Sequence, residues 1–150
     1  MKKFNTLGEV LAFAINLEQM ANLFYIDLSK RADTEAMKKI LLDLAEEENQ
    51  HKQRLERIIG IAENIPGDDL EHNEVAKYIA AVPTPDHMTY EDAIRLAMNK
   101  EHAAMMLYQI LAKFTDDKQL REVLELLAIE EAHHKRRFEK EYHDIKLKKN

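Results

Sequence analysis

The chain of 150 residues is predicted to be an all-α protein, a four-helix bundle of two repeated helical hairpins with one long crossover connection. Three observations predict this fold. Only 3 Gly and 3 Pro interrupt a chain that is 45% hydrophobic and 33% charged, which favours a compact helical protein. The second half of the chain repeats the first. Polar residues interrupt four apolar helical stripes, and they do so at positions that match between the repeats.

The two halves match without a gap when they are aligned at an offset of 83 residues. The most similar stretches are "LAEEENQH" at 44–51 and "LAIEEAHH" at 127–134, and each contains a Glu three residues before a His. Identical residues extend well beyond these stretches: Thr6 and Thr89, Asn16 and Asn99, Glu18 and Glu101, Ala21 and Ala104, Tyr25 and Tyr108, Arg54 and Arg137. Each half therefore predicts one helical hairpin.

The first hairpin is expected over 6–59. Its helices are expected at 6–31 and 34–59. Thr6 followed by Glu9 has the spacing of a capping box, which is typical of a helix start. Asp33-Thr34 interrupts the pattern where a tight turn and a second N-cap belong. Gly60 is expected to close the second helix as a C-terminal glycine.

The connection between the hairpins is expected over 61–88. This segment holds all three prolines and a predicted short helix near 70–81. A helix of about 25 residues is ~38 Å long, and the connection is long enough to travel that distance. We therefore expect the second hairpin to start at the end of the bundle opposite to where the first one stops.

The second hairpin is expected over 89–145. Its helices are expected at 89–113 and 116–145. Thr89, followed by Asp92, is expected to begin the first of them, and Thr115-Asp116 marks the turn between the two. A chain of this length is most simply one domain over 1–150.

Composition and charge exclude several classes of protein. The formal net charge of −6 argues against a nucleic-acid partner. No apolar run approaches the ~18 residues of a membrane span, and no apolar segment follows the basic start "MKKFNTLGEV" as a signal peptide would require. The chain has no Cys, which excludes disulfides, thiolate metal sites and a thiol nucleophile, and fits a cytoplasmic protein.

Six polar residues interrupt the inward stripes at the middle of the four expected helices, and in an antiparallel bundle they should meet at one level. They are Glu18, Glu48, His51, Glu101, Glu131 and His134. Four carboxylates in a core need compensation, because an unpaired buried charge is costly. No Lys or Arg lies on the inward stripes at this level, so a pair of cations is the expected partner. Oxygen and imidazole ligands suit iron or manganese.

This pattern resembles the rubrerythrin-like branch of the ferritin-like superfamily, in which two helices each provide a Glu and the other two each provide Glu-x-x-His. The match covers both hairpins. The resemblance implies two iron ions held by the six residues named above, and an oxidoreductase that reduces hydrogen peroxide or dioxygen. The alternative within the same superfamily is a ferroxidase, iron-binding or storage protein without peroxidase activity.

The chain departs from the rubrerythrin pattern in two respects. It lacks the cysteines of the rubredoxin module that many rubrerythrins carry, so the reductant must be external, for example a rubredoxin-type protein. Rubrerythrins proper also carry a Glu one turn after the ligand of the third helix. Here that position is Ala104, and its repeat mate is Ala21. This puts the iron-shuttling mechanism of the family in doubt.

Two pairs of residues near the six have two interpretations each. Tyr25 and Tyr108 lie two turns beyond Glu18 and Glu101, and they either fill the core or hydrogen-bond a ligand or supply an electron. Glu47 and Glu130 either accept the free ring N–H of the opposite His or belong to a solvated surface.

A homodimer is also expected. Phe13, Phe24 and Met106 are bulky apolar residues off the inward stripes, and such residues need cover. Each hairpin carries only three of the six residues, so an exchange of hairpins between protomers would preserve the site.

Overall fold

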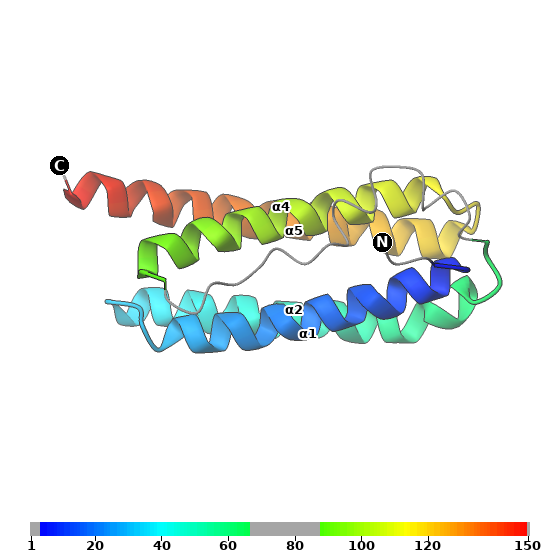
Figure 1. The fold of residues 1–150 in the computed structure, drawn as a ribbon, viewed down its shortest axis with the longest axis horizontal. Helices are drawn as coiled ribbons and strands as arrows, with labels where there is room; N and C mark the ends of the chain where they lie inside the picture. Colours follow the sequence, from blue (N-terminus) through cyan, green and yellow to red (C-terminus); the bar gives the residue numbers. More distant parts are fainter. Residues whose placement is uncertain (1–3, 67–87, 150) are drawn as a thin grey trace.

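The computed structural model of the protein describes residues 4–66 and 88–149. Four α-helices make up the described fold: α1 (Leu7–Ser29), α2 (Glu35–Ala62), α4 (Tyr90–Lys113) and α5 (Lys118–Lys149). They form two antiparallel hairpins, α1–α2 and α4–α5 (Figure 1). The predicted all-α four-helix bundle is confirmed. The short helix expected near 70–81, and most of the connection expected over 61–88, lie outside the described residues.

Three threonines begin helices as the sequence predicted. The side chains of Thr6, Thr34 and Thr89 each accept a hydrogen bond from the backbone N–H three residues later, at 3.2, 3.1 and 3.0 Å respectively. The start expected at 116 is wrong by two residues. Asp117 caps α5, because its Oδ1 accepts a hydrogen bond of 2.9 Å from the backbone N–H of Leu120.

Gly60 does not end the second helix. It lies inside α2, which continues to Ala62, and no glycine in the described residues has a positive φ. The helix ends where the chain turns to meet the start of α1. There the backbone N–H of Leu7 donates a 2.8 Å hydrogen bond to the carbonyl of Ile65. The fourth helix likewise outlasts its predicted end at 145 and reaches Lys149.

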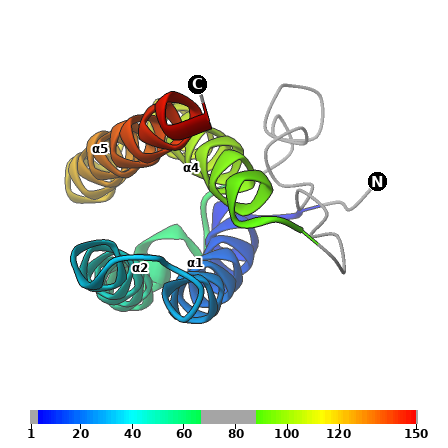
Figure 2. The same ribbon diagram turned by 90° about the vertical axis from the view of Figure 1, so that its left-hand side faces the viewer.

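The two hairpins stack as two layers, in which α1 faces α4 and α2 faces α5 (Figure 2). The end of α2 lies beside the start of α1. Met88, just before α4, lies at the other end of α1, where its carbonyl accepts a 2.7 Å hydrogen bond from Arg31. The second hairpin therefore starts at the opposite end of the bundle from where the first stops, as expected for a crossover connection.

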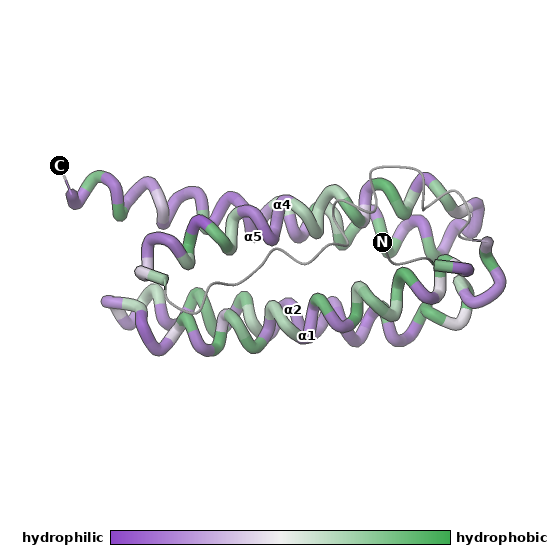
Figure 3. Tube along the Cα trace, viewed as in Figure 1, coloured by the Kyte–Doolittle hydropathy of each residue, from purple (hydrophilic) through white to green (hydrophobic). Residues whose placement is uncertain are grey.

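The apolar core is divided into two clusters along the bundle axis. One cluster packs the N-terminal half of α1 against the C-terminal half of α4, and its members include Leu7, Leu11, Leu55, Leu111 and Leu120. The other packs the opposite end, and its members include Tyr25, Leu28, Leu41, Ile94 and Phe138. Hydrophilic and hydrophobic residues alternate along all four helices (Figure 3). The polar level between the two clusters is where the six candidate residues lie.

The last turns of α5 extend beyond the other helices and are largely hydrophilic (Figures 1 and 3). The amino groups of Lys146 and Lys149 lie 3.5 and 3.2 Å from Glu91 at the start of α4, which ties this extension to its own hairpin. None of the helices in the described ranges has the length and apolarity that crossing a membrane requires.

The two glycines of the helices should respond in opposite ways to alanine. Gly60→Ala is expected to raise the free energy of unfolding by about 0.5–1 kcal/mol, because a Cβ there would meet no heavy atom within 4 Å. A Cβ at Gly8 would lie 3.1 Å from the Cα of Glu63 and 3.3 Å from its backbone nitrogen. Backbone atoms cannot rotate away, so Gly8→Ala should lower stability. Urea denaturation of both variants checks this, and an equal gain in both would contradict the close approach.

Candidate metal centre

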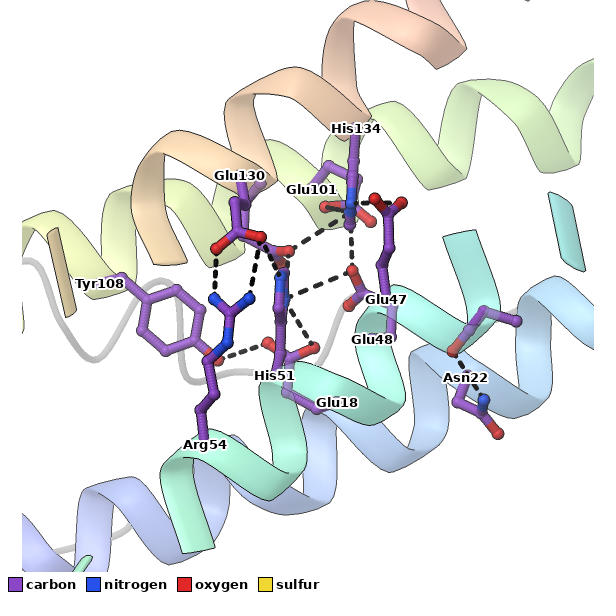
Figure 4. A network of polar contacts seen from close by, with 12 residues as sticks. Glu18, Asn22, Glu47, Glu48, His51, Arg54, Glu101, Tyr108, Glu130 and His134 are labelled. Carbon is purple, nitrogen blue, oxygen red and sulfur yellow. Dashed lines mark hydrogen bonds and ion pairs between the residues drawn. The ribbon is translucent and has the colours of Figure 1, made fainter. Parts of the chain in front are cut away.

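All six residues predicted from the repeat lie together at the polar level of the bundle. Figure 4 labels all of them except Glu131. We call them the donor cluster. Their exposed fractions are 2% for Glu18, 1% for Glu48, 0% for His51, 2% for Glu101, 1% for Glu131 and 4% for His134. The helical steps that predicted an inward position for each of them are therefore correct. The structure brings all six into one buried site.

The donor cluster forms two overlapping sets of four side chains, and Glu48 and Glu131 belong to both sets. Glu18 and His51 complete one set, and Glu101 and His134 complete the other. Within each set, one oxygen or nitrogen from every residue lies within 4.8 Å of the others. Each set takes three residues from one hairpin and one carboxylate from the other, so neither hairpin contains a complete set.

One atom of every residue in the donor cluster points inward and is buried without a hydrogen-bond partner. These atoms are Glu18 Oε2, Glu48 Oε1, His51 Nδ1, Glu101 Oε2, Glu131 Oε1 and His134 Nδ1. Buried polar atoms are rarely left unpaired, and an unpaired group in a native structure is often a sign of a bound ion or water. Six such atoms, gathered in two overlapping sets of four residues, could hold metal ions.

The distances between the inward atoms fit metal binding. His51 Nδ1 lies 2.9 Å from Glu131 Oε1 and 3.7 Å from Glu48 Oε1. His134 Nδ1 lies 2.7 Å from Glu48 Oε1 and 3.4 Å from Glu131 Oε1. Two ligand atoms that each lie about 2.1 Å from one cation are about 3 Å apart. Carboxylate oxygen and imidazole nitrogen are a donor set that iron and manganese accept.

Two tyrosines fix the carboxylates that come from the α1 and α4 helices. Tyr25 on α1 donates a 2.5 Å hydrogen bond to Glu101 Oε1, and Tyr108 on α4 donates one to Glu18 Oε1. Each tyrosine therefore holds the carboxylate of the opposite hairpin and leaves its Oε2 facing the centre. Burial and the nearby carboxylates raise the pKa of both phenols well above 10.0, so both remain donors.

The outer nitrogens of the two histidines face the residues that sequence analysis singled out beside the donor cluster. His134 Nε2 lies 3.2 Å from Glu47 Oε2, and His51 Nε2 lies 3.7 Å from Glu130 Oε1. Both carboxylates come from the opposite hairpin. The two rings are stacked, with centroids 5.5 Å apart. Arg54 contacts Glu130, and no role could be predicted for it, because its only signal in the sequence is its match to Arg137 in the repeat.

A small cavity adjoins the donor cluster on the side of α1 and α4. Its volume is about 70 Å³. Besides donor-cluster residues and the two tyrosines, its lining includes Leu17, Met20, Ala21, Lys100, Ala103, Ala104 and Leu107. The two alanines of the repeat thus border open space next to the site. The histidines lie on the other side, where α2 faces α5.

Burial changes the proton affinity of the donor cluster when no metal is bound. It raises the pKa of Glu48 and Glu131 well above 4.5, and neighbouring carboxylates add to the effect. Burial alone would lower the pKa of His51 and of His134, but hydrogen bonds and charges from the carboxylates raise both. For Glu18, burial opposes the direction of the shift, and the close approach of Glu48 and His51, together with the hydrogen bond from Tyr108, lowers its pKa.

The metal-free protein is therefore expected to lose stability as pH rises. Groups with a raised pKa stabilise the folded state fully below their unfolded pKa and lose that contribution as pH rises towards the folded pKa. The loss should start above the ordinary carboxyl value of 4.5 and increase above the imidazole value of 6.5. The lowered pKa of Glu18 changes the stability of the folded state only at pH values below 4.5.

Urea denaturation in a chelator at about pH 5 to about pH 8 measures this slope. The double variant Glu48→Gln, Glu131→Gln cannot ionise at these positions and should show a shallower decline. Stability of the metal-free protein that is independent of pH over this range would count against the clustering of the carboxylates.

Removal of one inward nitrogen should lower metal binding. His51→Ala takes one of four donors from its set, so the purified variant is expected to hold less metal per chain than the unmodified protein. His133→Ala is the matched control, because His133 neighbours His134 on α5 but is exposed. Elemental analysis after gel filtration checks both. Equal metal content in His51→Ala and His133→Ala would show that His51 does not bind the metal.

Comparison with known proteins places the chain in a family. Among curated proteins no match was found. A solved structure of a hypothetical protein from Pyrococcus furiosus is similar over 91% of this chain and 88% of that one, with 24% identity and a TM-score of 0.69. That likeness supports the fold alone. The family description "Rubrerythrin" matches residues 9–142, which include the whole donor cluster. The chain therefore belongs to the rubrerythrin family, a family of ferritin-like di-iron proteins.

Proposed function

We propose that the protein is a di-iron carboxylate oxidoreductase that reduces hydrogen peroxide or dioxygen with electrons from an external donor. The observation that carries the proposal is the pair of overlapping four-residue sets in the buried donor cluster, which share Glu48 and Glu131. Four carboxylates carry four negative charges, which two divalent cations would balance. The family match supports iron as the cation.

The side chains of the donor cluster would hold the two proposed iron ions. When bound, two ferrous ions supply the two electrons that cleave an O–O bond. Glu18 and His51 would hold one ion and Glu101 and His134 the other, while Glu48 and Glu131, which belong to both sets, would serve both ions. Tyr25 and Tyr108 keep the terminal carboxylates turned towards the centre through their hydrogen bonds.

The cavity supports a small oxidant as the substrate. Its volume of about 70 Å³ is well below the roughly 300–1,000 Å³ of pockets that enclose larger organic ligands. Ala21 and Ala104 keep the space beside the donor cluster open. Reduction of hydrogen peroxide to two water molecules takes up two electrons and two protons, and the electrons must be restored from outside because the chain has no Cys-based redox module.

A rubredoxin-type protein is the proposed reductant.

A homodimer is the proposed assembly. Large apolar side chains are exposed on α1 and α5, among them Leu23 at 57%, Leu126 at 50% and Ile129 at 54%. Phe13 and Phe24, which sequence analysis expected to need cover, are partly buried against the core. Exchange of hairpins between protomers stays a prediction.

Anaerobic metal analysis followed by rapid mixing tests the proposed function. The reduced protein should contain two irons per chain and should be oxidised by peroxide or by dioxygen within one turnover. We expect peroxide to react faster, in keeping with the resemblance to rubrerythrins. An iron content of hundreds per assembly would instead support storage, and bound iron that neither oxidant attacks would contradict the proposal.

The role of the cavity gives a sharper test. Ala104→Phe places a ring where the cavity lies, so oxidation should slow at least tenfold, about 1.4 kcal/mol of barrier, while the iron content stays at the unmodified level. Ala36→Phe makes the same change at an exposed position in the first turn of α2. Unchanged rates in Ala104→Phe would show that the oxidant reaches the donor cluster by another route.

A further inference from the structure

The repeat makes the donor cluster symmetric, but the surroundings of its two histidines differ. Glu47 and Glu130 occupy matching positions, and each faces the outer nitrogen of the histidine in the opposite hairpin. Glu130 also receives two hydrogen bonds from the guanidinium of Arg54, one of them 3.3 Å long. Arg137 matches Arg54 in the repeat. Within the described ranges, no hydrogen bond joins Arg137 to Glu47. Arg137 acts on Glu47 only through its positive charge.

Arg54 changes what Glu130 can do for His51. A guanidinium that donates two hydrogen bonds to a carboxylate occupies both oxygens and offsets the negative charge. His51 Nε2 is buried without a hydrogen-bond partner, 3.7 Å from Glu130. Glu47, by contrast, keeps its charge and lies 3.2 Å from His134 Nε2.

The basicity of an imidazole ligand depends on what its second nitrogen contacts. A carboxylate that accepts the ring N–H makes the other nitrogen a stronger metal ligand, and loss of such a partner typically weakens metal binding by about 10–100-fold. Both histidines of the donor cluster present Nδ1 to the centre and Nε2 to the outer carboxylate. The difference in the outer contacts therefore acts directly on the metal-binding nitrogens.

We infer that the two metal positions are unequal and that Arg54 is the positioning residue that makes them so. By holding Glu130, it leaves His51 a weaker ligand than His134. The position formed with Glu101 and His134 binds its cation more tightly than the one formed with Glu18 and His51. The inference rests on the proposed function only in that the donor cluster must bind two metal ions.

Co²⁺ titration of the metal-free protein, followed by calorimetry and by optical absorption, tests this inference without any measurement of activity. Glu47→Gln should weaken one of the two binding steps by about 10–100-fold. Glu130→Gln should weaken binding by less than about threefold, because Arg54 already neutralises that carboxylate. Equal losses in the two variants would overturn the inference. Binding of fewer than two Co²⁺ ions to the unmodified protein would overturn both the inference and the proposed metal centre.

A double-mutant cycle separates the effect of Arg54 on His51 from a merely structural role. In Arg54→Met, Glu130 no longer contacts a guanidinium, so the dissociation constants of the two Co²⁺-binding steps should become more similar. Glu130→Gln added to Arg54→Met should then cost at least about tenfold in affinity. Arg137→Met is the matched control, since it removes the same charge from the corresponding exposed position and should leave the gap between the steps in place. If Glu130→Gln costs equally little with and without Arg54, the inference is wrong.

Discussion

The structure depends on one constraint, the burial of four carboxylates at a single level of a helical core. Placing Glu18, Glu48, Glu101 and Glu131 there divides the apolar core into two clusters. The carboxylates can remain there only with protons or cations as partners, because lone buried charges are costly. The hydrogen bonds from Tyr25 and Tyr108 and the two histidines are further consequences of the same constraint. Each tyrosine satisfies one oxygen of a carboxylate and leaves the other oxygen free for the centre.

The repeat is strict in the donor cluster and only partial in the rest of the chain. The six donors and the two tyrosines are related by the repeat. The cavity wall is only partly symmetric: Ala21 matches Ala104, but Lys100 occupies the position that matches Leu17, and Ala103 the position that matches Met20. Lys100 lies over the ring of Phe24 from the opposite hairpin, with its amino group 5.0 Å from the ring centroid. A sequence with an internal repeat can thus keep the residues of its donor cluster identical while the residues that line the cavity differ between the two halves.

The sequence predicted the donor cluster because a six-residue pattern repeated at helical spacing leaves few alternatives. It also predicted the three threonine caps, whose hydrogen bonds are local. Errors arose where distant contacts decide the outcome. Gly60 stays helical because the end of α2 is set by its meeting with Leu7, a contact that no local pattern encodes. The role of Arg54 depends on a cross-hairpin contact, so its identity in the repeat could not reveal it.

The crossover topology also orders the events of folding. Contacts within each hairpin are local in sequence, whereas the hydrogen bonds from Tyr25 and Tyr108 join residues 76 and 90 positions apart. Local contacts form earlier than distant ones, because closing a long chain loop costs entropy before any contact rewards it. We therefore expect the hairpins to form first, each with three of the six donors. The enclosed centre exists only after they dock, so a metal ion that arrives early meets half a site and one that arrives late meets a closed bundle.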